Sequence, residues 1–329
     1  MLVCPACGGD LTPWRKATGA DTAVSSDEER FELLRCDCCG SARTVETSGS
    51  GIGRPVVSSD SYEGGYYSRP PVWLDRLIEP LRKVADRGRL KRIGRTRPGS
   101  RVLEYGAGDG RLLETLAARG AEVAGVEPSA SARERAAERG VVLTPDLDDI
   151  PAGMDRFDRI ICWHVLEHLE DPAAEMKRLA ELMGPGGRVI VSVPNLSSWQ
   201  ARIGGDYWFG QDVPRHLTHF TPAGIRSLCE QAGLAVESVH TWSLEQNPFG
   251  MWQTLTSRAS GSRDAVFKLI KRQPLGETVR TRVTSILGLL LALPLFLLAL
   301  PLECLASVLG RGGTITVILC KQGSGEAGS

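Results

Sequence analysis

The most regular feature of the sequence is an alternation of short apolar runs with amphipathic segments, which begins near residue 101. The runs are rich in β-branched residues, whereas the segments between them space their apolar positions three and four residues apart. This alternation predicts buried strands joined by helices, and therefore a mostly parallel α/β sheet. The expected strands are 101–105, 122–126, 141–143, 159–162, 188–193, 235–241 and 314–321.

The same pattern predicts where the helices begin. A helix is expected over 71–93, interrupted or started afresh at Pro80. Another begins at Gly110. Asp171 should cap a helix that has Pro at its first position, and Thr221 should cap a further one.

Composition divides the chain into five segments. The expected division is a cysteine-rich unit at 1–45, a turn-rich linker at 46–70, an α/β core at 71–242, a basic and apolar helical insertion at 243–312, and the last strand with a tail at 313–329. The insertion separates the last two expected strands, so both of its ends should lie on the same side of the sheet.

Charge and the N-terminus narrow the class of protein. The chain has 39 Lys and Arg against 39 Asp and Glu, and this neutral balance argues against a dedicated nucleic-acid binder. The N-terminus carries cysteines instead of a basic stretch followed by an apolar run, so we expect a cytoplasmic protein. In that setting, nine cysteines indicate metal binding or reduced thiols instead of disulfides.

A glycine-rich loop follows the first expected strand, in the sequence VLEYGAGDG at 102–110. Glycines let the backbone approach a ligand, and the helix that follows offers unpaired N–H groups. The spacing G-x-G-x-G differs from the dinucleotide fingerprint, because Arg111 occupies the place of its third glycine. Glu104 would repel a pyrophosphate and favour a cation, and Glu127 follows at the distance typical of a ribose-binding acid. These features indicate S-adenosylmethionine, whose amine and sulfonium are both cationic.

Residues 101–193 resemble the class I S-adenosylmethionine-dependent methyltransferases. The match rests on the E/D-x-G-x-G-x-G motif, on Glu127, and on the run FDRIICWHVLEHLEDP. It implies a Rossmann-like, seven-stranded, mostly parallel sheet with an antiparallel last strand. It also implies a cofactor site formed by Glu104, Gly106, Ala107, Gly108, Gly110, Glu127, Pro128, Asp146, Leu147, Cys162 and Trp163.

Four of the five histidines bear on the chemistry, whereas His240 falls inside an expected strand and is expected to be structural. The run His164-Val-Leu-Glu-His168 spells an inverted zinc-protease motif, but it begins where a parallel strand ends and lacks the long helix that such a site needs. Methylation of a hydroxyl benefits from a general base near neutrality. We expect this base among His216, His219 and His164, with His216 first; the alternative is that His216 and His219 only hydrogen-bond around a helix start.

The cysteine-rich unit has the spacing of a zinc ribbon. Cys4 and Cys7 form one C-x-x-C pair and Cys36 and Cys39 the other, and each pair is followed by glycine. That shared C-G feature selects Cys39 over Cys38. Four protein ligands would make the zinc structural, although the intervening loop is longer than usual; reduced thiols are the alternative.

Residues 286–309 are nearly all apolar and long enough to cross a bilayer as a helix. Pro294, Pro301 and Glu303 argue against a single span, and basic residues flank the segment at Lys268, Lys271, Arg272, Arg280, Arg282 and Arg311. We expect a re-entrant or interfacial helical hairpin at the cytoplasmic face of the membrane. A buried helical pair at an oligomer interface is the alternative.

The sequence therefore predicts a methyltransferase that modifies a hydroxyl on a small-molecule, saccharide or lipid-linked acceptor. One rival is an RNA methyltransferase that grips nucleic acid with the ribbon; the neutral charge and the absence of an N/D-P-P-Y/F-type motif oppose it. A second rival is a non-catalytic, membrane-anchored scaffold that binds S-adenosylmethionine. The oligomeric state is left open.

Overall fold

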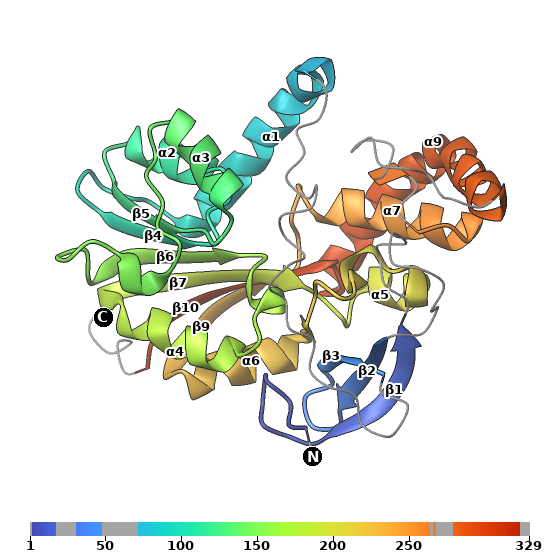
Figure 1. The fold of residues 1–329 in the computed structure, drawn as a ribbon, viewed down its shortest axis with the longest axis horizontal. Helices are drawn as coiled ribbons and strands as arrows, with labels where there is room; N and C mark the ends of the chain where they lie inside the picture. The colour runs from blue at the N-terminus through green and yellow to red at the C-terminus, as the bar shows by residue number, and fades with distance from the viewer. Residues whose placement is uncertain (1, 18–30, 48–71, 264–265, 268–278, 323–329) are drawn as a thin grey trace.

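Within the residues that the structure describes, a six-stranded sheet forms the core, in the order β5-β4-β6-β7-β10-β9 (Figure 1). The computed structural model describes residues 2–17, 31–47, 72–263, 266–267 and 279–322. The strands are β4 (Arg101–Tyr105), β5 (Glu122–Val126), β6 (Phe157–Trp163), β7 (Met183–Pro194), β9 (Leu234–His240) and β10 (Thr314–Lys321).

The sheet has the predicted mixture of directions. β5, β4, β6 and β7 pair in parallel, whereas β10 is antiparallel to both of its neighbours, β7 and β9. One expected strand is missing: residues 141–143 are not a strand, and only Thr144 beside them forms an isolated bridge to Val126. A stretch with a single bridge has no ladder to hold it extended, so the observed sheet is one strand narrower than expected.

Helices cover both faces of this sheet and largely follow the predicted signals. Asp171 caps α4 by accepting hydrogen bonds from two backbone N–H groups, and Thr221 caps α6. Pro80 lies inside the continuous helix α1, so the expected interruption is absent. The helices are α1 (Val72–Ile93), α2 (Arg111–Ala117), α3 (Ala130–Glu138), α4 (Pro172–Glu181), α5 (Trp199–Gly204) and α6 (Pro222–Gln231), with 3-10 turns η1 (Leu147–Asp149), η2 (Leu166–His168), η3 (Gly205–Tyr207) and η4 (Phe209–Gln211).

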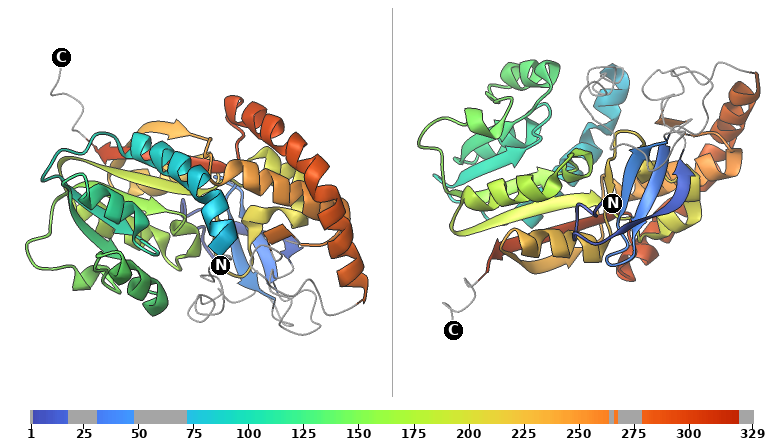
Figure 2. Two further views of the ribbon diagram at one scale, coloured as in Figure 1. Left: turned by 90° about the horizontal axis from the view of Figure 1, so that it is seen from above. Right: turned by 60° about the horizontal axis from the view of Figure 1, so that its bottom comes forward.

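The cysteine-rich unit forms a second sheet in the order β1-β2-β3-β8, which the core helps to build. Its strands are β1 (Leu11–Ala17), β2 (Phe31–Cys36), β3 (Ala42–Glu46) and β8 (Thr218–His219). We call the described residues of the unit, 2–17 and 31–46, the ribbon. Figures 1 and 2 show the ribbon against the α5 and α6 side of the core. Most of the expected linker at 46–70 lies outside the described residues.

The insertion before β10 differs from the expected proline-broken hairpin. It contains α7 (Asn247–Ser260) and α9 (Val279–Val308), which lie side by side (Figures 1 and 2). Pro294 and Pro301 are both inside α9, so the apolar segment itself is one continuous helix. Both ends of the insertion do lie on the same side, because β9 and β10 are neighbours.

Glu303 on α9 is fully buried and has three partners. Its carboxylate accepts hydrogen bonds from Gln200 Nε2 at 2.8 Å, Asn247 Nδ2 at 2.8 Å and the Gly313 backbone N–H at 2.7 Å. These partners compensate for the burial of the carboxylate inside the protein, so the polar group is tolerated within an apolar helix. Glu303 also joins α9 to α5, α7 and the start of β10.

Candidate functional site

The glycine-rich loop lies between β4 and α2 in an unusual backbone conformation. Gly106, Gly108 and Gly110 have φ angles of 78°, 56° and 71°, in the left-handed region that favours glycine. A Cβ added to Gly106 would stand 2.3 Å from Val165 Cγ2. The loop can therefore follow this path, and bring its backbone close to a ligand, only because the side chains are absent.

Glu104, at the end of β4, is buried and incompletely paired. It is 4% exposed, and no described residue offers a hydrogen-bond partner to its Oε2. Burial raises the pKa of Glu104 to about 8, and the charge of Arg89 offsets part of this rise. A cationic ligand beside Oε2 would stabilise the ionised carboxylate, which fits the expected ammonium of S-adenosylmethionine.

Glu127, at the end of β5, is buried and holds the loop in place. Its Oε2 accepts a hydrogen bond from the Gly108 backbone N–H at 2.9 Å, and its Oε1 accepts from the Ser129 N–H at 3.0 Å. Each carboxylate oxygen has a second lone pair. The predicted ribose contact of Glu127 stays a prediction, and Ala107 and Pro128 lie at the same edge of the sheet, where the Ala107 N–H donates to the Val126 carbonyl at 3.0 Å.

The predicted adenine-side residues lie on the 3-10 turn η1. Asp146 Oδ1 caps this turn by accepting from the Asp148 N–H at 3.1 Å, and Arg178 Nη2 lies 3.3 Å from the same oxygen. Leu147 is buried in the main core cluster. These contacts order the turn, and its role in binding adenine stays a prediction.

The end of β6 carries the next expected residues. Cys162 is fully buried in the core, between Tyr105 of β4 and Val191 of β7, so its predicted contact with the cofactor stays a prediction. Trp163 is 8% exposed, its indole Nε1 has no partner in the described part of the chain, and the Arg89 guanidinium carbon lies 5.3 Å from its ring centroid. Trp163 thus adds a second unpaired polar atom, on the strand that neighbours β4.

His164 follows β6 with a φ of 56°, which is uncommon for a residue other than glycine. Its Nδ1 lies 3.0 Å from Glu167 Oε1. A carboxylate only accepts, so Nδ1 carries the hydrogen and Nε2 is the lone-pair nitrogen of the neutral ring. Nε2 is buried and meets no hydrogen-bond partner among the residues described. Glu167 therefore orients the ring, and the role of His164 as a general base stays a prediction.

Glu167 is 1% exposed and supports His164 as an ionised group. Burial alone would raise the pKa of Glu167, but the hydrogen bond from His164 and the nearby histidine charges lower it to about 2. Sequence reasoning noticed Glu167 only as part of a rejected protease motif. The residue spacing H-x-x-E directly after a strand was the signal that could have identified the pair.

In each of the other two candidate bases, His216 and His219, a ring nitrogen is held in a hydrogen bond. His216 Nδ1 donates to the Gly210 carbonyl at 2.9 Å, and its Nε2 is 3.9 Å from Asp212 Oδ2. His219 Nε2 contacts the Thr44 hydroxyl at 3.0 Å, and burial lowers the pKa of His219 well below its usual value. The rings of His216 and His168 are 4.7 Å apart, so these histidines form one cluster beside η2.

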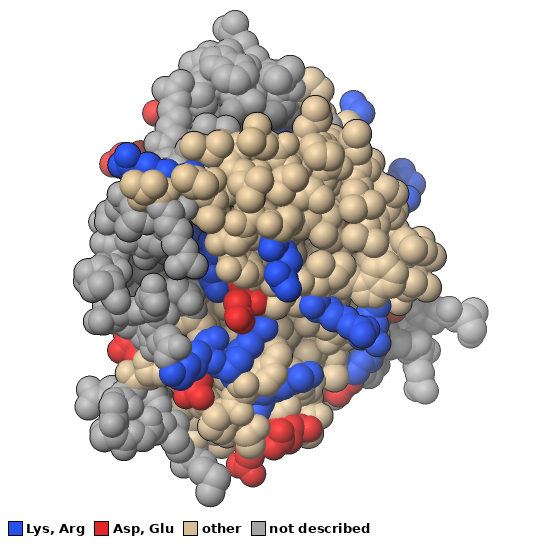
Figure 3. Space-filling view, turned by 90° about the vertical axis from the view of Figure 1, so that its right-hand side faces the viewer, with Lys and Arg blue, Asp and Glu red and all other residues tan. Residues whose placement is uncertain are grey.

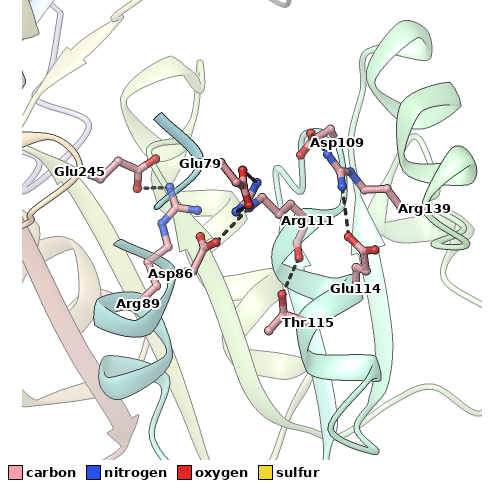
Figure 4. A network of polar contacts seen from close by, with 9 residues as sticks. All are labelled: Glu79, Asp86, Arg89, Asp109, Arg111, Glu114, Thr115, Arg139 and Glu245. Atoms are coloured by element: carbon pink, nitrogen blue, oxygen red, sulfur yellow. Dashed lines mark hydrogen bonds and ion pairs between the residues drawn. The ribbon is translucent and has the colours of Figure 1, made fainter. Parts of the chain in front are cut away.

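Helix α1 is fastened to this edge of the sheet by ion pairs that the sequence did not indicate. Arg111, the first residue of α2, makes a two-pronged contact with Glu79 at 2.9 and 3.0 Å and binds Asp86 Oδ2 at 2.9 Å (Figure 4). Arg89 pairs with Glu245, in the loop after β9. Arg111, which breaks the dinucleotide fingerprint, thus anchors α1 over the start of α2.

The four predicted cysteines of the ribbon converge. Cys4 Sγ lies 3.7 Å from Cys39 Sγ, Cys7 Sγ lies 3.4 Å from Cys36 Sγ, and all four sulfurs lie within 4.8 Å of one another. Tetrahedral zinc with Zn–S bonds near 2.3 Å separates its sulfurs by about 3.8 Å, so the four residues fit that ion. Cys38 is exposed and lies outside the group.

Comparison with known proteins agrees with this geometry. The sequence model of a family described as "Methyltransferase domain" matches residues 77–239. A ubiquinone biosynthesis O-methyltransferase of Alkalilimnicola ehrlichii is 33% identical over 179 residues, which cover 49% of this chain and 70% of that protein. The chain belongs to the class I S-adenosylmethionine-dependent methyltransferases.

Two further comparisons show how much of this chain resembles other methyltransferases. The protein of the same name from Aeromonas salmonicida is 35% identical over 155 residues, which cover 43% of this chain and 65% of that relative. The chain thus spans slightly less than two thirds of that relative's length. The crystal structure of a SAM-dependent methyltransferase from Archaeoglobus fulgidus has a TM-score of 0.45 and 16% identity, and the match covers 76% of this chain and 99% of that one.

Proposed function

We propose that this protein transfers a methyl group from S-adenosylmethionine to a hydroxyl of a small-molecule, saccharide or lipid-linked acceptor at the cytoplasmic face of the membrane. The observation that carries the proposal is the presence of two buried, unpaired atoms at one sheet edge, Glu104 Oε2 and His164 Nε2, with no partner among the described residues. Glu104 Oε2 could pair with a cationic cofactor, and His164 Nε2 could accept the proton of a hydroxyl group. When bound, S-adenosylmethionine supplies an electrophilic methyl group.

The residues at the ends of β4 and β5 would hold the cofactor. Glu104 pairs with its ammonium group, the loop from Gly106 to Gly110 approaches it with bare backbone, and Glu127 accepts from its ribose hydroxyls. Asp146 and Leu147 would border the adenine. Holding the cofactor rigidly matters, because an in-line displacement gains much of its rate from the placement of the two reacting atoms.

His164 would accept the proton of the acceptor hydroxyl on Nε2 while Glu167 holds Nδ1–H. A general base of this kind contributes about 10²- to 10⁴-fold to a rate. His216 is a weaker candidate, because its Nδ1 is held by a backbone carbonyl and the Asp212 carboxylate lies 3.9 Å from its Nε2, beyond hydrogen-bond distance. The name of the curated relatives, O-methyltransferase, supports a hydroxyl acceptor.

The ribbon cysteines Cys4, Cys7, Cys36 and Cys39 would hold one structural zinc ion. With four protein ligands no position is left open for a substrate or a water molecule, so the ion would stabilise the ribbon and take no direct part in the chemistry.

The surface of α9 supports the membrane location. Arg282–Val308 is long and apolar enough to cross a membrane by length and composition, yet only 17% of its most apolar window is buried. Within this span eleven described large apolar residues are exposed: Val283, Ile286, Leu287, Leu290, Leu293, Phe296, Leu297, Leu298, Leu300, Leu305 and Val308. A soluble monomer rarely exposes so large an apolar surface.

Charge borders this surface instead of interrupting it. In Figure 3 the middle of the upper part of the face, at the height of α7 and α9, carries no charged side chain, whereas Lys and Arg lie at its outer edges and, interspersed with Asp and Glu, along its lower margin. Arg282 and Arg311 flank the described apolar residues, while Lys268, Lys271 and Arg272 and the side chain of Arg280 lie outside the described part of the structure. A basic rim around an apolar face suits an interfacial helix on anionic lipid.

The experiment that tests the proposal uses S-adenosylmethionine with a labelled methyl group. Purified protein and its Glu104→Ala variant are incubated with lipid, saccharide and RNA fractions of host cells. Label in the lipid or saccharide fraction, absent with the variant, is the expected result. Label confined to RNA would contradict the acceptor class, and retained cofactor binding with no label in any fraction would favour the non-catalytic scaffold.

A further inference from the structure

The geometry points to a role for the ribbon in methyl transfer: through Thr44 it positions the segment 216–219, which completes the acceptor side of the site. We call residues 216–219 the histidine segment. The inference rests on the proposed function for its catalytic consequence, whereas its structural part can be tested without a methyl acceptor.

Part of the histidine segment, β8, belongs to the core in sequence but is the fourth strand of the ribbon sheet. β3 pairs antiparallel with β8, with Ala42 opposite His219 and Arg43 opposite Thr218. Arg43 Nη1 donates to the Thr218 hydroxyl at 3.0 Å. The ribbon thus supplies the edge on which this part of the core is ordered.

Thr44 makes three contacts with the histidine segment and is fully buried. Its backbone N–H donates to the Leu217 carbonyl at 2.9 Å, and its hydroxyl donates to the His216 carbonyl at 2.7 Å. The same Oγ1 lies 3.0 Å from His219 Nε2. A hydroxyl has one hydrogen, which the His216 carbonyl already takes, so His219 Nε2 must be the donor in the second contact. Thr44 therefore selects the Nε2–H tautomer of His219.

The opposite edge of the histidine segment meets the proposed base. The Leu217 backbone N–H donates to the Glu167 carbonyl at 2.7 Å, and the Glu167 side chain in turn binds His164. Leu217 is thus held between Thr44 through its carbonyl and Glu167 through its N–H. A displacement of β3 would be transmitted along this path to the residue that orients His164.

The cysteine group lies at the other end of the same path. Thr221, two residues after His219, donates through its hydroxyl to the Cys39 carbonyl at 2.7 Å and through its N–H to Ser41 Oγ at 3.1 Å. A Cβ added to Gly224 would stand 2.0 Å from Ser41 Oγ, so the two parts fit closely. A metal ion held by Cys39 and its partners would fix this contact, and with it the start of β3.

The test compares Thr44→Val with Thr44→Ser and with Thr12→Val, which removes a hydroxyl from an exposed position of the ribbon. Because the chain has five histidines, their ring nitrogens can be followed by ¹⁵N NMR. We expect Thr44→Val to shift the His216 and His219 signals and to remove the Nε2–H signature of His219. Thr44→Ser should restore them, Thr12→Val should leave them unchanged, and the affinity for S-adenosylmethionine should change less than twofold in all three.

A second arm follows the metal and the reaction separately. Removing zinc with a chelator should perturb the same two histidines, and Thr44→Val should retain its zinc while lowering the initial rate of label transfer at least tenfold, with rescue by Thr44→Ser. Unchanged histidine spectra in Thr44→Val would overturn the inference. If no fraction accepts label even with the unaltered protein, the proposed function fails, but the spectra still decide whether the ribbon positions the histidine segment.

Discussion

His164 Nδ1 lies 3.0 Å from Glu167 Oε1, and the pair stands at the end of β6 with the second ring nitrogen, Nε2, unpaired among the described residues. Replacing His164 with Ala removes the proposed base, so methyl transfer should fall by about 10²-fold or more. Single-turnover rates with labelled cofactor check this, and calorimetry should show an unchanged affinity for S-adenosylmethionine. Replacing His216 with Asn should cost less; an equal or greater loss there would assign the base to His216.

Glu104 should make cofactor binding depend on pH. Because its pKa is raised to about 8 by burial, the carboxyl group is protonated at lower pH and must release that proton to pair with an ammonium ion. We expect the affinity to increase from pH 6 to pH 8, by nearly tenfold per unit. Calorimetric titrations across this range measure the slope. Glu104→Gln should bind weakly with little slope, whereas Glu181→Gln, at an exposed position on α4, should behave as the unaltered protein does.

The raised pKa of Glu104 also makes the stability of the folded protein depend on pH in the absence of cofactor. The folded-state pKa of Glu104 exceeds its ordinary value of 4.5, so the folded protein binds the proton more tightly than the unfolded chain does. The contribution of this group to stability is therefore full below about pH 4.5 and is lost as the pH rises to about 8. Urea unfolding at several pH values should show this decline, and an equal decline in Glu104→Gln would assign it to other groups.

The cysteine group predicts about one zinc ion per chain, measured by elemental analysis. Cys36→Ser should lose most of the metal and reduce the stability of the ribbon. Cys38→Ser is the matched control, because Cys38 lies between Cys36 and Cys39 in the sequence but outside the converging group. Loss of zinc from the control instead would show that the fourth ligand is Cys38.

The exposed face of α9 predicts binding to vesicles that contain anionic lipid. Changing both Leu293 and Leu297, which are 72% and 70% exposed, to Arg should weaken partitioning by at least about tenfold. Val142→Arg, at an 85% exposed position shortly after α3 in the chain, tests whether added charge acts by itself. Absence of vesicle binding together with a dimer in sedimentation experiments would indicate that a second copy covers this face.

Glu303 predicts a large effect from a residue outside the proposed site. Glu303→Ala would leave the donors of Gln200, Asn247 and Gly313 without their acceptor, so the free energy of unfolding should fall by about 3 kcal/mol or more. Chemical denaturation measures the change. Cys304→Ser alters the next, exposed residue of α9 and should change stability little.

Local patterns in the sequence predicted most of the fold, and the residues predicted to bind the cofactor lie at one edge of the observed sheet. Apolar runs identified six observed strands, and the shared C-G feature selected Cys39, because these signals depend on neighbours in the chain. The stretch 141–143 also looks apolar, but a strand needs a partner along its length and this one has a single bridge beside it.

The remaining features depend on residues that are distant in sequence. β8 has two residues and no periodicity, and it exists because Ala42 and Arg43 lie beside it. Glu303 is acceptable inside an apolar helix only because Gln200 and Asn247 reach it from other elements. The proposed role of His164 as a base likewise depends on its orientation by Glu167. The spacing H-x-x-E indicates this pair only when it is known that β6 ends immediately before His164.

The position of β10 has a consequence for the order of events during synthesis. β10 lies between β7 and β9 in the sheet, and in the chain it comes after all the other strands and after α9. A growing chain therefore exposes α9 to its surroundings before the strand that fills the middle of the sheet has left the ribosome, and earlier segments fold first. If α9 binds lipid as proposed, it can meet the membrane while the sheet is still open, and attachment would then precede completion of the fold.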